Sequence, residues 1–229
     1  MRALFSILAF LVAGGCANDS IESDRSAFAT PAKYPAVCRL QSPQIAGSLI
    51  PIGDQRAVTA RHLLRQPVVR VDGKLTGVDS LENGLGAEVS AGDWVVLQVN
   101  DTPLPEPDAL VEDYAFRDGS LVFLSGFASA VGSSSGPSLV HAEVQRPPFW
   151  VPTESGIVYL RVEGSPDLSG MSGGPVVIPD DDGTGWRVVG LYLGRWQSAG
   201  WTGYVVRPLP IEIFARTESN GVKEQAKPD

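Results

Sequence analysis

Short runs rich in β-branched and aromatic residues constrain the fold of this chain more than any other feature. In the clearest run, Asp93–Val99, the residues Val95, Leu97 and Val99 fall on one face of an expected strand. Further runs of this kind span Ser120–Gly126, Ile157–Val162, Arg187–Leu193 and Gly203–Arg207. No stretch sustains the period of about 3.6 residues that a long helix needs, so the sequence predicts an all-β protein.

Turns are frequent, and their placement predicts two closed barrels. Gly and Pro contribute 25 and 18 of the 229 residues, and the segment between Pro179 and Trp186 predicts a hairpin loop. Many short strands at close spacing imply antiparallel sheets. The Ser/Gly-rich segment Ser129–Ser138 divides the body into two similar halves, each suited to a six-stranded barrel. We therefore expect one barrel over about residues 37–127, a second over about 138–210, and a functional cleft between them.

Charge and composition exclude several classes of function. Asp and Glu outnumber Lys and Arg by 26 to 18, and the net charge of −8 argues against a nucleic-acid-binding protein, which needs a basic face. Two Cys and two His cannot build a four-Cys zinc site or a His-rich metal centre. We expect neither a metal nor a cofactor.

The N-terminus has the pattern of an export signal. An Arg precedes the apolar run Ala3–Ala13, which is too short for a lasting membrane span. Residues 1–16 end in Val-Ala-Gly-Gly-Cys, which resembles a bacterial lipobox, with Ala13 where Leu is commonest. Lipidation of Cys16 would make the protein a periplasmic or cell-envelope lipoprotein of a bacterium. The alternative is ordinary signal cleavage near Ala17.

The segments around the body carry little periodicity. Residues 17–36 are rich in Ser, Asp, Ala and Pro, which predicts a tether, and residues 219–229 form a polar tail. Cys38 has no partner within the expected domain, so it is predicted to be a buried and inert thiol.

Two motifs carry groups suited to acyl transfer. His62 follows Ala57–Arg61 at the end of an expected strand, although a lone His in such a place is more often structural. The segment Gly170–Pro175 reads Gly-Met-Ser-Gly-Gly-Pro and places the hydroxyl of Ser172 on a tight turn. Glycines in such a turn let backbone N–H groups face a developing oxyanion.

A carboxylate that could orient an imidazole heads the run at Asp93. Taken by itself, this acid is better explained by the turn Ala91–Asp93. Asp72 and Asp79 are competing candidates, but neither precedes a continuous apolar run.

Together these motifs resemble those of the trypsin/chymotrypsin-like serine peptidases, especially the bacterial branch that includes the HtrA-type proteases. Val58–His62 resembles the Thr-Ala-Ala-His block of that family, and Asp93–Val99 resembles its Asp-Ile-Ala-Leu-Leu block. Gly170–Pro175 matches its Gly-x-Ser-Gly-Gly-Pro block, and the spacings of 31 and 79 residues keep the order His, Asp, Ser. The resemblance covers roughly residues 47–216 and implies a chymotrypsin-like peptidase domain over 37–218.

The resemblance implies a role for each site residue. Ser172 would be the nucleophile, His62 would take and return its proton, and Asp93 would orient His62. The backbone N–H groups of Gly170 and Ser172 would form the oxyanion hole.

Substrate-binding residues follow from the same resemblance. The segment Leu191–Gly194, with Leu193 and Gly194 at its end, would be the edge along which a peptide lies as an added strand. Pro166 and Asp167 would lie in the loop that forms the floor of the specificity pocket. Asp167 either selects basic side chains or is a solvated loop acid.

The chain also departs from the family pattern. Arg61 stands in place of a small residue before His62, and His141 has no motif around it and is expected to be structural. Met171 occupies the position where zymogen-forming members have an Asp that receives a newly cut N-terminal ammonium. We therefore expect no activating cleavage beyond removal of the signal.

Two classes of function remain open. The first is an exported or lipid-anchored serine endopeptidase that hydrolyses a protein or peptide substrate through an acyl-enzyme. The second is a trypsin-like fold without activity that serves as a binding, adhesion or assembly module. Retention of His62, Asp93 and Ser172 favours the enzyme.

The lipid anchor can be tested by detergent partitioning. If Cys16 is acylated, the wild-type protein should enter the Triton phase, because each buried CH₂ contributes about 0.8 kcal/mol. The Cys16→Ser variant should remain in the aqueous phase. Equal release of both proteins into the aqueous phase would contradict the lipid anchor and favour ordinary signal cleavage.

Overall fold

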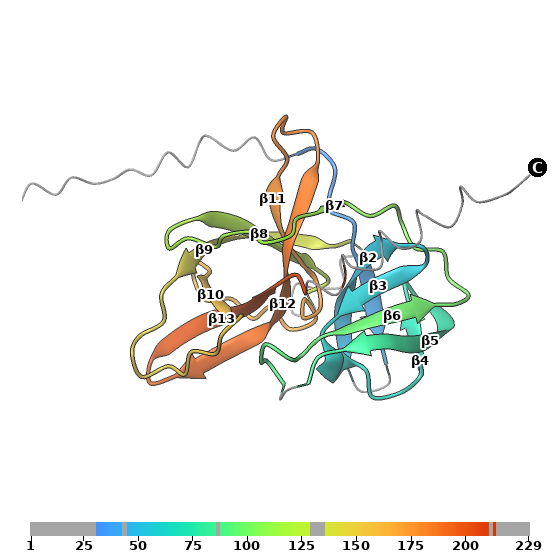
Figure 1. Cartoon of the computed structure of the whole chain (residues 1–229), viewed down its shortest axis with the longest axis horizontal. Helices are drawn as coiled ribbons and strands as arrows, with labels where there is room; N and C mark the ends of the chain where they lie inside the picture. Colours follow the sequence, from blue (N-terminus) through green and yellow to red (C-terminus); the bar gives the residue numbers. More distant parts are fainter. Residues whose placement is uncertain (1–30, 43–44, 86–87, 129–135, 211–212, 214–229) are drawn as a thin grey trace, which may run out of the picture.

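The molecule consists of two β-barrels that pack side by side (Figure 1). The computed structural model describes residues 31–42, 45–85, 88–128, 136–210 and 213. The predicted all-β fold with two six-stranded antiparallel barrels is confirmed.

The first barrel contains β1 (Cys38–Gln41), β2 (Ala46–Gly53), β3 (Arg56–Thr59), β4 (Val68–Val71), β5 (Lys74–Asn83) and β6 (Val95–Val99). These strands close in the order β1-β2-β3-β6-β5-β4, and every pair is antiparallel. A single 3₁₀ turn, η1 (Arg61–Leu63), follows β3 directly. The His motif therefore lies at the open end of this barrel, where β3 finishes.

The second barrel contains β8 (Leu121–Gly126), β9 (Ser138–Gln145), β10 (Val158–Arg161), β11 (Pro175–Pro179), β12 (Trp186–Ser198) and β13 (Trp201–Pro208). Its strands run in the order β11-β8-β9-β10-β13-β12, and pairing of β11 with β12 closes the barrel. The predicted hairpin across the Asp/Gly-rich loop is this β11–β12 pair. A short strand, β7 (Ala109–Leu110), adds to β12 in parallel.

The boundary between the barrels differs from the predicted one. Ser120–Gly126 is predicted to lie in the first barrel, but β8 pairs with β9 and β11 of the second barrel. The reason is that six strands within Cys38–Val99 already close the first barrel. The Ser/Gly-rich segment therefore links β8 to β9, and its residues 129–135 lie outside the described residues.

The predicted tether is shorter than expected, because its last residues fold onto the body. The backbone N–H of Ala36 donates a hydrogen bond to Asp108 at 2.6 Å. The indole N–H of Trp186 donates to the carbonyl of Lys33, also at 2.6 Å. Residues 1–30, which include Cys16, and the tail 219–229 lie outside the described residues.

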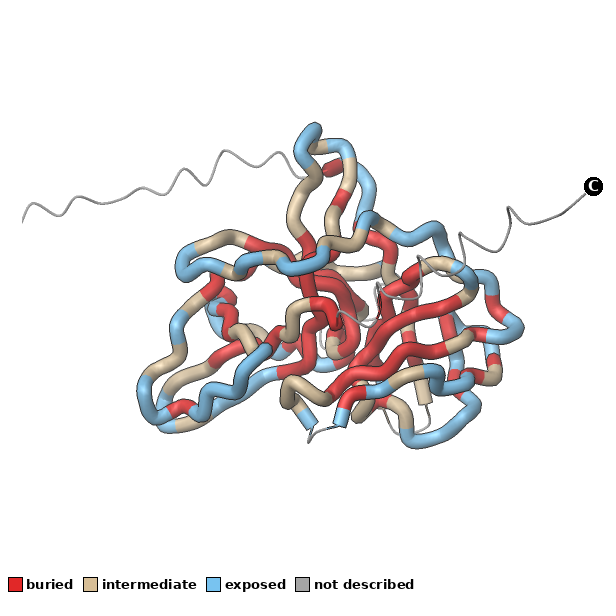
Figure 2. The backbone as a smooth tube through the Cα atoms, viewed as in Figure 1, coloured by how far each residue is buried: buried red, intermediate tan, exposed pale blue. Residues whose placement is uncertain are grey.

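Buried residues lie toward the middle of both barrels (Figure 2). Alternate residues of β12 belong to two different cores. On β12, Tyr192 belongs to the cluster inside the second barrel, whereas Leu191 and Leu193 join the cluster that fills the first barrel and the interface. This two-residue period is the normal geometry of a strand. The strand therefore closes its own barrel and fixes it to its neighbour with the same few residues.

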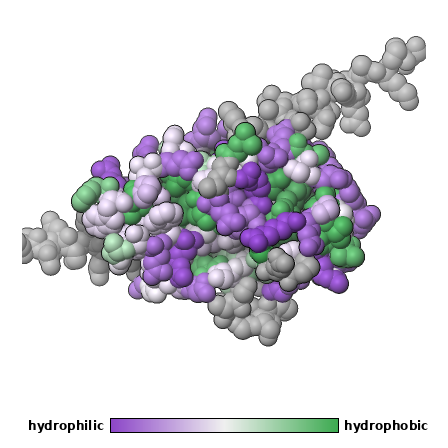
Figure 3. Space-filling view, turned by 90° about the horizontal axis from the view of Figure 1, so that it is seen from below, coloured by the Kyte–Doolittle hydropathy of each residue, from purple (hydrophilic) through white to green (hydrophobic). Residues whose placement is uncertain are grey.

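The surface and the free thiol agree with an ordinary globular protein. On the face seen in Figure 3, hydrophobic residues gather in separate patches between hydrophilic ones, as is usual for protein surfaces. Cys38 is buried and unpaired as predicted, and its burial raises the pKa of its thiol, which makes the thiol unreactive. Within the described ranges, no helix is long and apolar enough to cross a membrane.

Candidate active site

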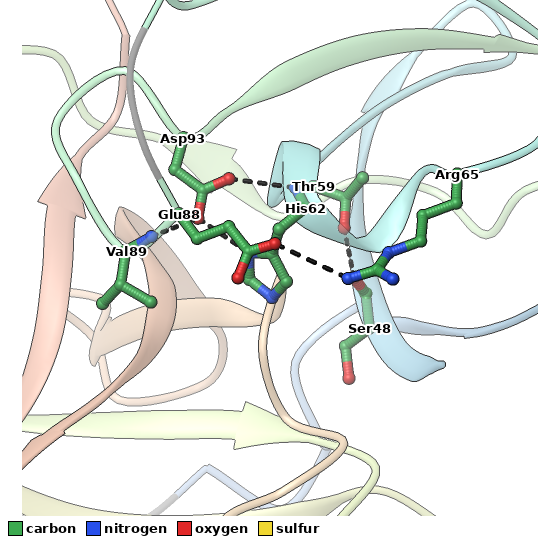
Figure 4. Close-up of polar contacts among 7 residues, drawn as sticks. All are labelled: Ser48, Thr59, His62, Arg65, Glu88, Val89 and Asp93. Atoms are coloured by element: carbon green, nitrogen blue, oxygen red, sulfur yellow. Dashed lines mark hydrogen bonds and ion pairs between the residues drawn. The ribbon is translucent and has the colours of Figure 1, made fainter. Parts of the chain in front are cut away.

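His62, which is partly exposed, forms a hydrogen-bonded pair with the buried Asp93 at the edge of the first barrel (Figure 4). The Nδ1 atom of His62 lies 2.7 Å from Oδ2 of Asp93, and the backbone N–H of His62 donates to Oδ1 at 3.0 Å. The 3₁₀ turn η1 makes both contacts possible, because it turns the main chain and the ring of one residue toward the same carboxylate. In Figure 4, the other ring nitrogen points away from Asp93.

The carboxylate of Asp93 has a further donor that fixes its ionised form. Its side chain is 1% exposed, and the backbone N–H of Val89 donates to Oδ2 at 2.7 Å. Burial alone raises the pKa of Asp93, but hydrogen bonds and charge from His62, together with the two backbone donors, hold it below its ordinary value. The carboxylate can therefore remain charged and accept the Nδ1 proton.

The two competing acids lie elsewhere. Asp72 accepts a hydrogen bond from the backbone of Arg39 on β1, at 2.8 Å. Asp79 accepts one from the amide of Asn100, at 3.1 Å. Of the three candidate acids, only Asp93 is hydrogen-bonded to His62.

The turn that holds Ser172 leads directly into β11 and leaves two of its backbone N–H groups without an acceptor among the described residues. Gly170 and Gly173 adopt φ values of 91° and 82°, which residues with a side chain rarely tolerate. The N–H groups of Met171, Gly173 and Gly174 bond to other carbonyls of the turn or of β12. In the described part of the chain, the N–H groups of Gly170 and Ser172 have no such acceptor, so they remain available to a ligand.

Contacts between the barrels bring this turn to the His62 side of the molecule. The backbone N–H of Ser48 on β2 donates to the carbonyl of Ser172 at 2.8 Å. A Cβ atom at Gly173 would lie only 2.2 Å from Oγ1 of Thr59, which comes three residues before His62. Only a glycine allows the turn to approach so closely.

The hydroxyl of Ser172 lies beside the loop that carries Asp93. A Cβ atom built at Gly194 would be 4.0 Å from Oγ of Ser172 and 3.3 Å from a methyl of Val89. No hydrogen bond joins Oγ of Ser172 to His62 among the described residues. Contacts between nucleophile and base are often loose in the absence of substrate. The structure thus brings His62 and Asp93 into contact and packs the Ser172 turn against Ser48 and Thr59 of the same barrel.

The predicted pocket-floor residues lie in the loop before the turn. Asp167 is exposed, and its carboxylate accepts hydrogen bonds from the N–H and Oγ of Ser169, at 3.0 and 2.6 Å. These bonds lower the pKa of Asp167. The carbonyl of Pro166 accepts a hydrogen bond of 2.6 Å from the hydroxyl of Tyr204. Asp167 is thus already engaged within its own loop.

The predicted substrate edge is part of β12. Leu193 is fully buried, and a register shift against β13 occurs between Tyr192 and Gly194. From Gly194 to Ser198, one edge of β12 pairs with β13, while no described strand pairs with its other edge. Leu193 is therefore shielded as a whole residue, whereas Gly194, next to Val89 and Ser172, begins the stretch of β12 with an unpaired edge.

Three other predicted residues are placed by the structure. Arg61 is half-buried in η1, directly before His62. His141 is exposed on β9 and packs edge-to-face on Phe123, with ring centroids 4.4 Å apart. The described residues contain no group of three or more His, Cys, Asp or Glu side chains suited to a metal ion.

Two residues of the site carry no sequence motif that marks them. Val89 donates its backbone N–H to Asp93 from a φ of 56°, an unusual conformation for a β-branched residue. Ser48 bonds to the nucleophile turn across a long stretch of sequence. Backbone strain and long-range contacts of this kind leave no local pattern in the sequence.

No protein-family model matches this chain, and no curated protein matches it significantly. Solved structures do match. Mouse neuropsin, a serine protease, is 16% identical with a TM-score of 0.59, covering 83% of this chain and 96% of its own. The Rv3671c protease of M. tuberculosis in its active form is 18% identical with a TM-score of 0.53, covering 83% and 88%. The fold is chymotrypsin-like.

The structural neighbours include proteins with and without activity. The inactivated protease paralogue S-I1 of the scabies mite is 14% identical with a TM-score of 0.61, covering 83% of this chain and 96% of its own. The inactive form of the Rv3671c protease has the same TM-score as the active form, 0.53. These likenesses establish the fold, and membership of the HtrA-related branch stays a prediction.

The ionised state of Asp93 can be tested through the pH dependence of stability. Because its pKa is lower in the folded chain, the carboxylate stabilises the fold above its unfolded pKa of about 4. That contribution is lost as the pH falls through the folded pKa. Between pH 5 and pH 2, the urea concentration at the midpoint of unfolding should therefore fall less for Asp93→Asn than for the wild type.

The exposed Asp79 provides the matched control. An Asp79→Asn variant should keep the wild-type pH dependence, because its carboxylate bonds only to a surface amide. If Asp93→Asn and Asp79→Asn have the same pH dependence as the wild type, the folded protein does not hold the pKa of Asp93 below its ordinary value.

Proposed function

We propose that this protein is a serine endopeptidase. The observation that carries the proposal is the hydrogen bond between His62 and the buried Asp93, together with a serine turn that packs on the same barrel and has two unbonded N–H groups. Hydrolysis of a peptide bond needs a base, a nucleophile and donors for an oxyanion, and this site offers a candidate for each. The chymotrypsin-like fold, shared with serine proteases, adds independent support.

The proposed first half-reaction forms an acyl-enzyme. Oγ of Ser172 attacks the carbonyl carbon of the scissile peptide bond while Nε2 of His62 takes the hydroxyl proton. The carbonyl oxygen becomes an oxyanion and accepts hydrogen bonds from the N–H groups of Gly170 and Ser172. His62 then passes the proton to the amide nitrogen, the C–N bond breaks, and the amine leaves.

The second half-reaction releases the acid product. Water attacks the ester carbonyl, His62 takes a proton from it, and the same two N–H groups hold the second oxyanion. The ester C–O bond then breaks, and the proton returns to Oγ of Ser172. Throughout the cycle, Asp93 stays ionised and fixes the orientation of the imidazole.

The proposed binding mode adds the substrate to β12 as a strand. From Gly194 to Ser198, β12 pairs with β13 along one edge, and no described strand pairs with its other edge. A Cβ atom at Gly194 would lie 4.0 Å from Oγ of Ser172. Backbone hydrogen bonds along such an edge hold a peptide regardless of its sequence. They would place a scissile carbonyl next to Ser172, as an endopeptidase requires.

We further propose that the peptidase acts in a bacterial cell envelope, exported by its N-terminal segment and anchored by lipid on Cys16. The sequence of residues 1–16 supports this proposal. The substrate would then be a protein or peptide of the periplasm or the cell surface, with membrane contact through the lipid alone.

Covalent chemistry at Ser172 is the direct test of the proposal. A fluorophosphonate probe should add one phosphonyl group to the wild-type protein and none to Ser172→Ala, as read by intact-mass spectrometry. Loss of either Ser172 or His62 should lower kcat on a peptide substrate by about 10⁶, and loss of both by little more, because the groups act as one unit.

An unmodified mass for the folded wild-type protein would contradict the proposal. The second class of function, an inactive trypsin-like fold used for binding, would then be favoured, as in the inactivated scabies mite paralogue. A labelled protein whose mass also shifts after Ser172→Ala would place the nucleophile at another residue.

Activity should not require a newly cut N-terminus. Met171 is fully buried in the core of the second barrel and carries no charge to receive an ammonium. A protein that begins near Ala27 behind an uncleavable tag should therefore be as active as a matched protein whose tag is removed. Activity that emerges only after tag removal would show that a free N-terminus orders the site.

A further inference from the structure

Ser48 is a fully buried polar residue of the first barrel that bonds to the nucleophile turn of the second barrel. Its backbone N–H donates to the carbonyl of Ser172 at 2.8 Å. Its hydroxyl donates to the carbonyl of Gly170 at 3.1 Å and accepts a hydrogen bond from the N–H of Phe127, also at 3.1 Å. One residue therefore holds both carbonyls that border the Met171–Ser172 peptide.

These bonds help to determine where the unbonded N–H of Ser172 points. The Gly170 carbonyl fixes the peptide before Met171, and the Ser172 carbonyl fixes the peptide after Ser172. The N–H of Ser172 lies on the peptide between these two. The carbonyl of that middle peptide, at Met171, accepts a hydrogen bond of 2.9 Å from the N–H of Gly174, so the N–H of Ser172 points to the opposite side. Ser48 therefore holds the peptides on either side of one that the turn itself fixes.

The residues packed around Ser48 leave little room for the nucleophile turn to shift. A Cβ atom at Gly126 would lie 2.8 Å from Oγ of Ser48 and 3.0 Å from Cα of Met171. A Cβ atom at Gly173 would lie 2.2 Å from the carbonyl oxygen of Ser48. That oxygen also accepts a hydrogen bond of 2.6 Å from Oγ1 of Thr59. Ser48 thus connects the turn to the strand that delivers His62.

We infer that Ser48 is a positioning residue that orders the oxyanion turn from the first barrel. The inference rests on the proposed peptidase function. In zymogen-forming relatives, an inserted N-terminal ammonium orders this turn, but Met171 offers an ammonium no charged partner here. Ser48 would order the turn in its place. Ser48 acts through Gly170 and Ser172 and does not itself touch the substrate.

The test compares two buried serines beside the same turn. Ser48→Ala removes the hydroxyl that bonds Gly170, whereas Ser125→Ala removes a buried hydroxyl that has no partner in the described part of the chain. Ser125 is 1% exposed, and its carbonyl oxygen would be 2.2 Å from a Cβ atom at Gly174. The two variants therefore match in burial, chemistry and location.

We expect Ser48→Ala to lower kcat about 10- to 100-fold with KM within about threefold, because a small misplacement of oxyanion donors acts mainly in the transition state. Affinity for a peptide boronate, which mimics the tetrahedral intermediate, should fall by a similar factor. Ser125→Ala should stay within about twofold of wild type in both measurements, since it removes no hydrogen bond. Ser48→Cys, a weaker donor, should be intermediate, and it replaces Ser48→Ala if that variant does not fold.

Amide hydrogen exchange of residues 168–176 provides a readout that does not need activity. In the folded Ser48 variants, these amides should exchange faster than in the wild type and in Ser125→Ala. If fluorophosphonate does not label the wild-type protein, the proposed peptidase function is wrong. The exchange data would still show whether Ser48 orders the turn. The inference would be overturned if these amides exchange in Ser48→Ala as slowly as in the wild type. It would also be overturned if fluorophosphonate labels the wild type and Ser48→Ala keeps the wild-type kcat.

Discussion

The site depends on the surface of the first barrel, at Ser48 and Thr59, against which the Ser172 turn of the second barrel packs. Gly173 lies so close to Ser48 and Thr59 that a single added carbon atom would collide with both. That closeness lets the backbone of Ser48 bond Ser172 and lets its hydroxyl bond Gly170. Because β2 and β3 are fixed in a closed barrel, the turn takes its position from a rigid surface. Such rigidity is what preorganised donors need in order to stabilise a developing charge.

The buried carboxylate is the second constraint, because its desolvation must be offset by donors. Asp93 receives hydrogen bonds from the ring and the backbone of His62 and from the backbone of Val89. Val89 reaches it from a left-handed conformation, and its side chain fills the space next to Gly194. Strain of this kind persists where surrounding contacts require it, which is common at functional sites. The same loop thus holds Asp93 and limits the space beside Ser172.

Much of this arrangement follows from local sequence, and the remainder depends on long-range contacts. The alternation in Asp93–Val99 and the hairpin signal before Trp186 predict β6 and the β11–β12 pair, because a strand period is local. Membership of β8 in the second barrel could not be predicted, since the alternation of a strand does not depend on which partner it pairs with. The His62–Asp93 contact follows from motifs, whereas Ser48 bonds to Gly170 across 122 residues and forms no motif with it.

In the proposed mechanism, the two unbonded N–H groups and Ser172 act on one reacting centre. A crystal structure of the protein after reaction with a fluorophosphonate tests this most directly. We expect phosphorus bonded to Oγ of Ser172, with one phosphonyl oxygen accepting hydrogen bonds from the N–H groups of both Gly170 and Ser172. Phosphorus on any other residue, or a phosphonyl oxygen turned away from these two groups, would contradict it.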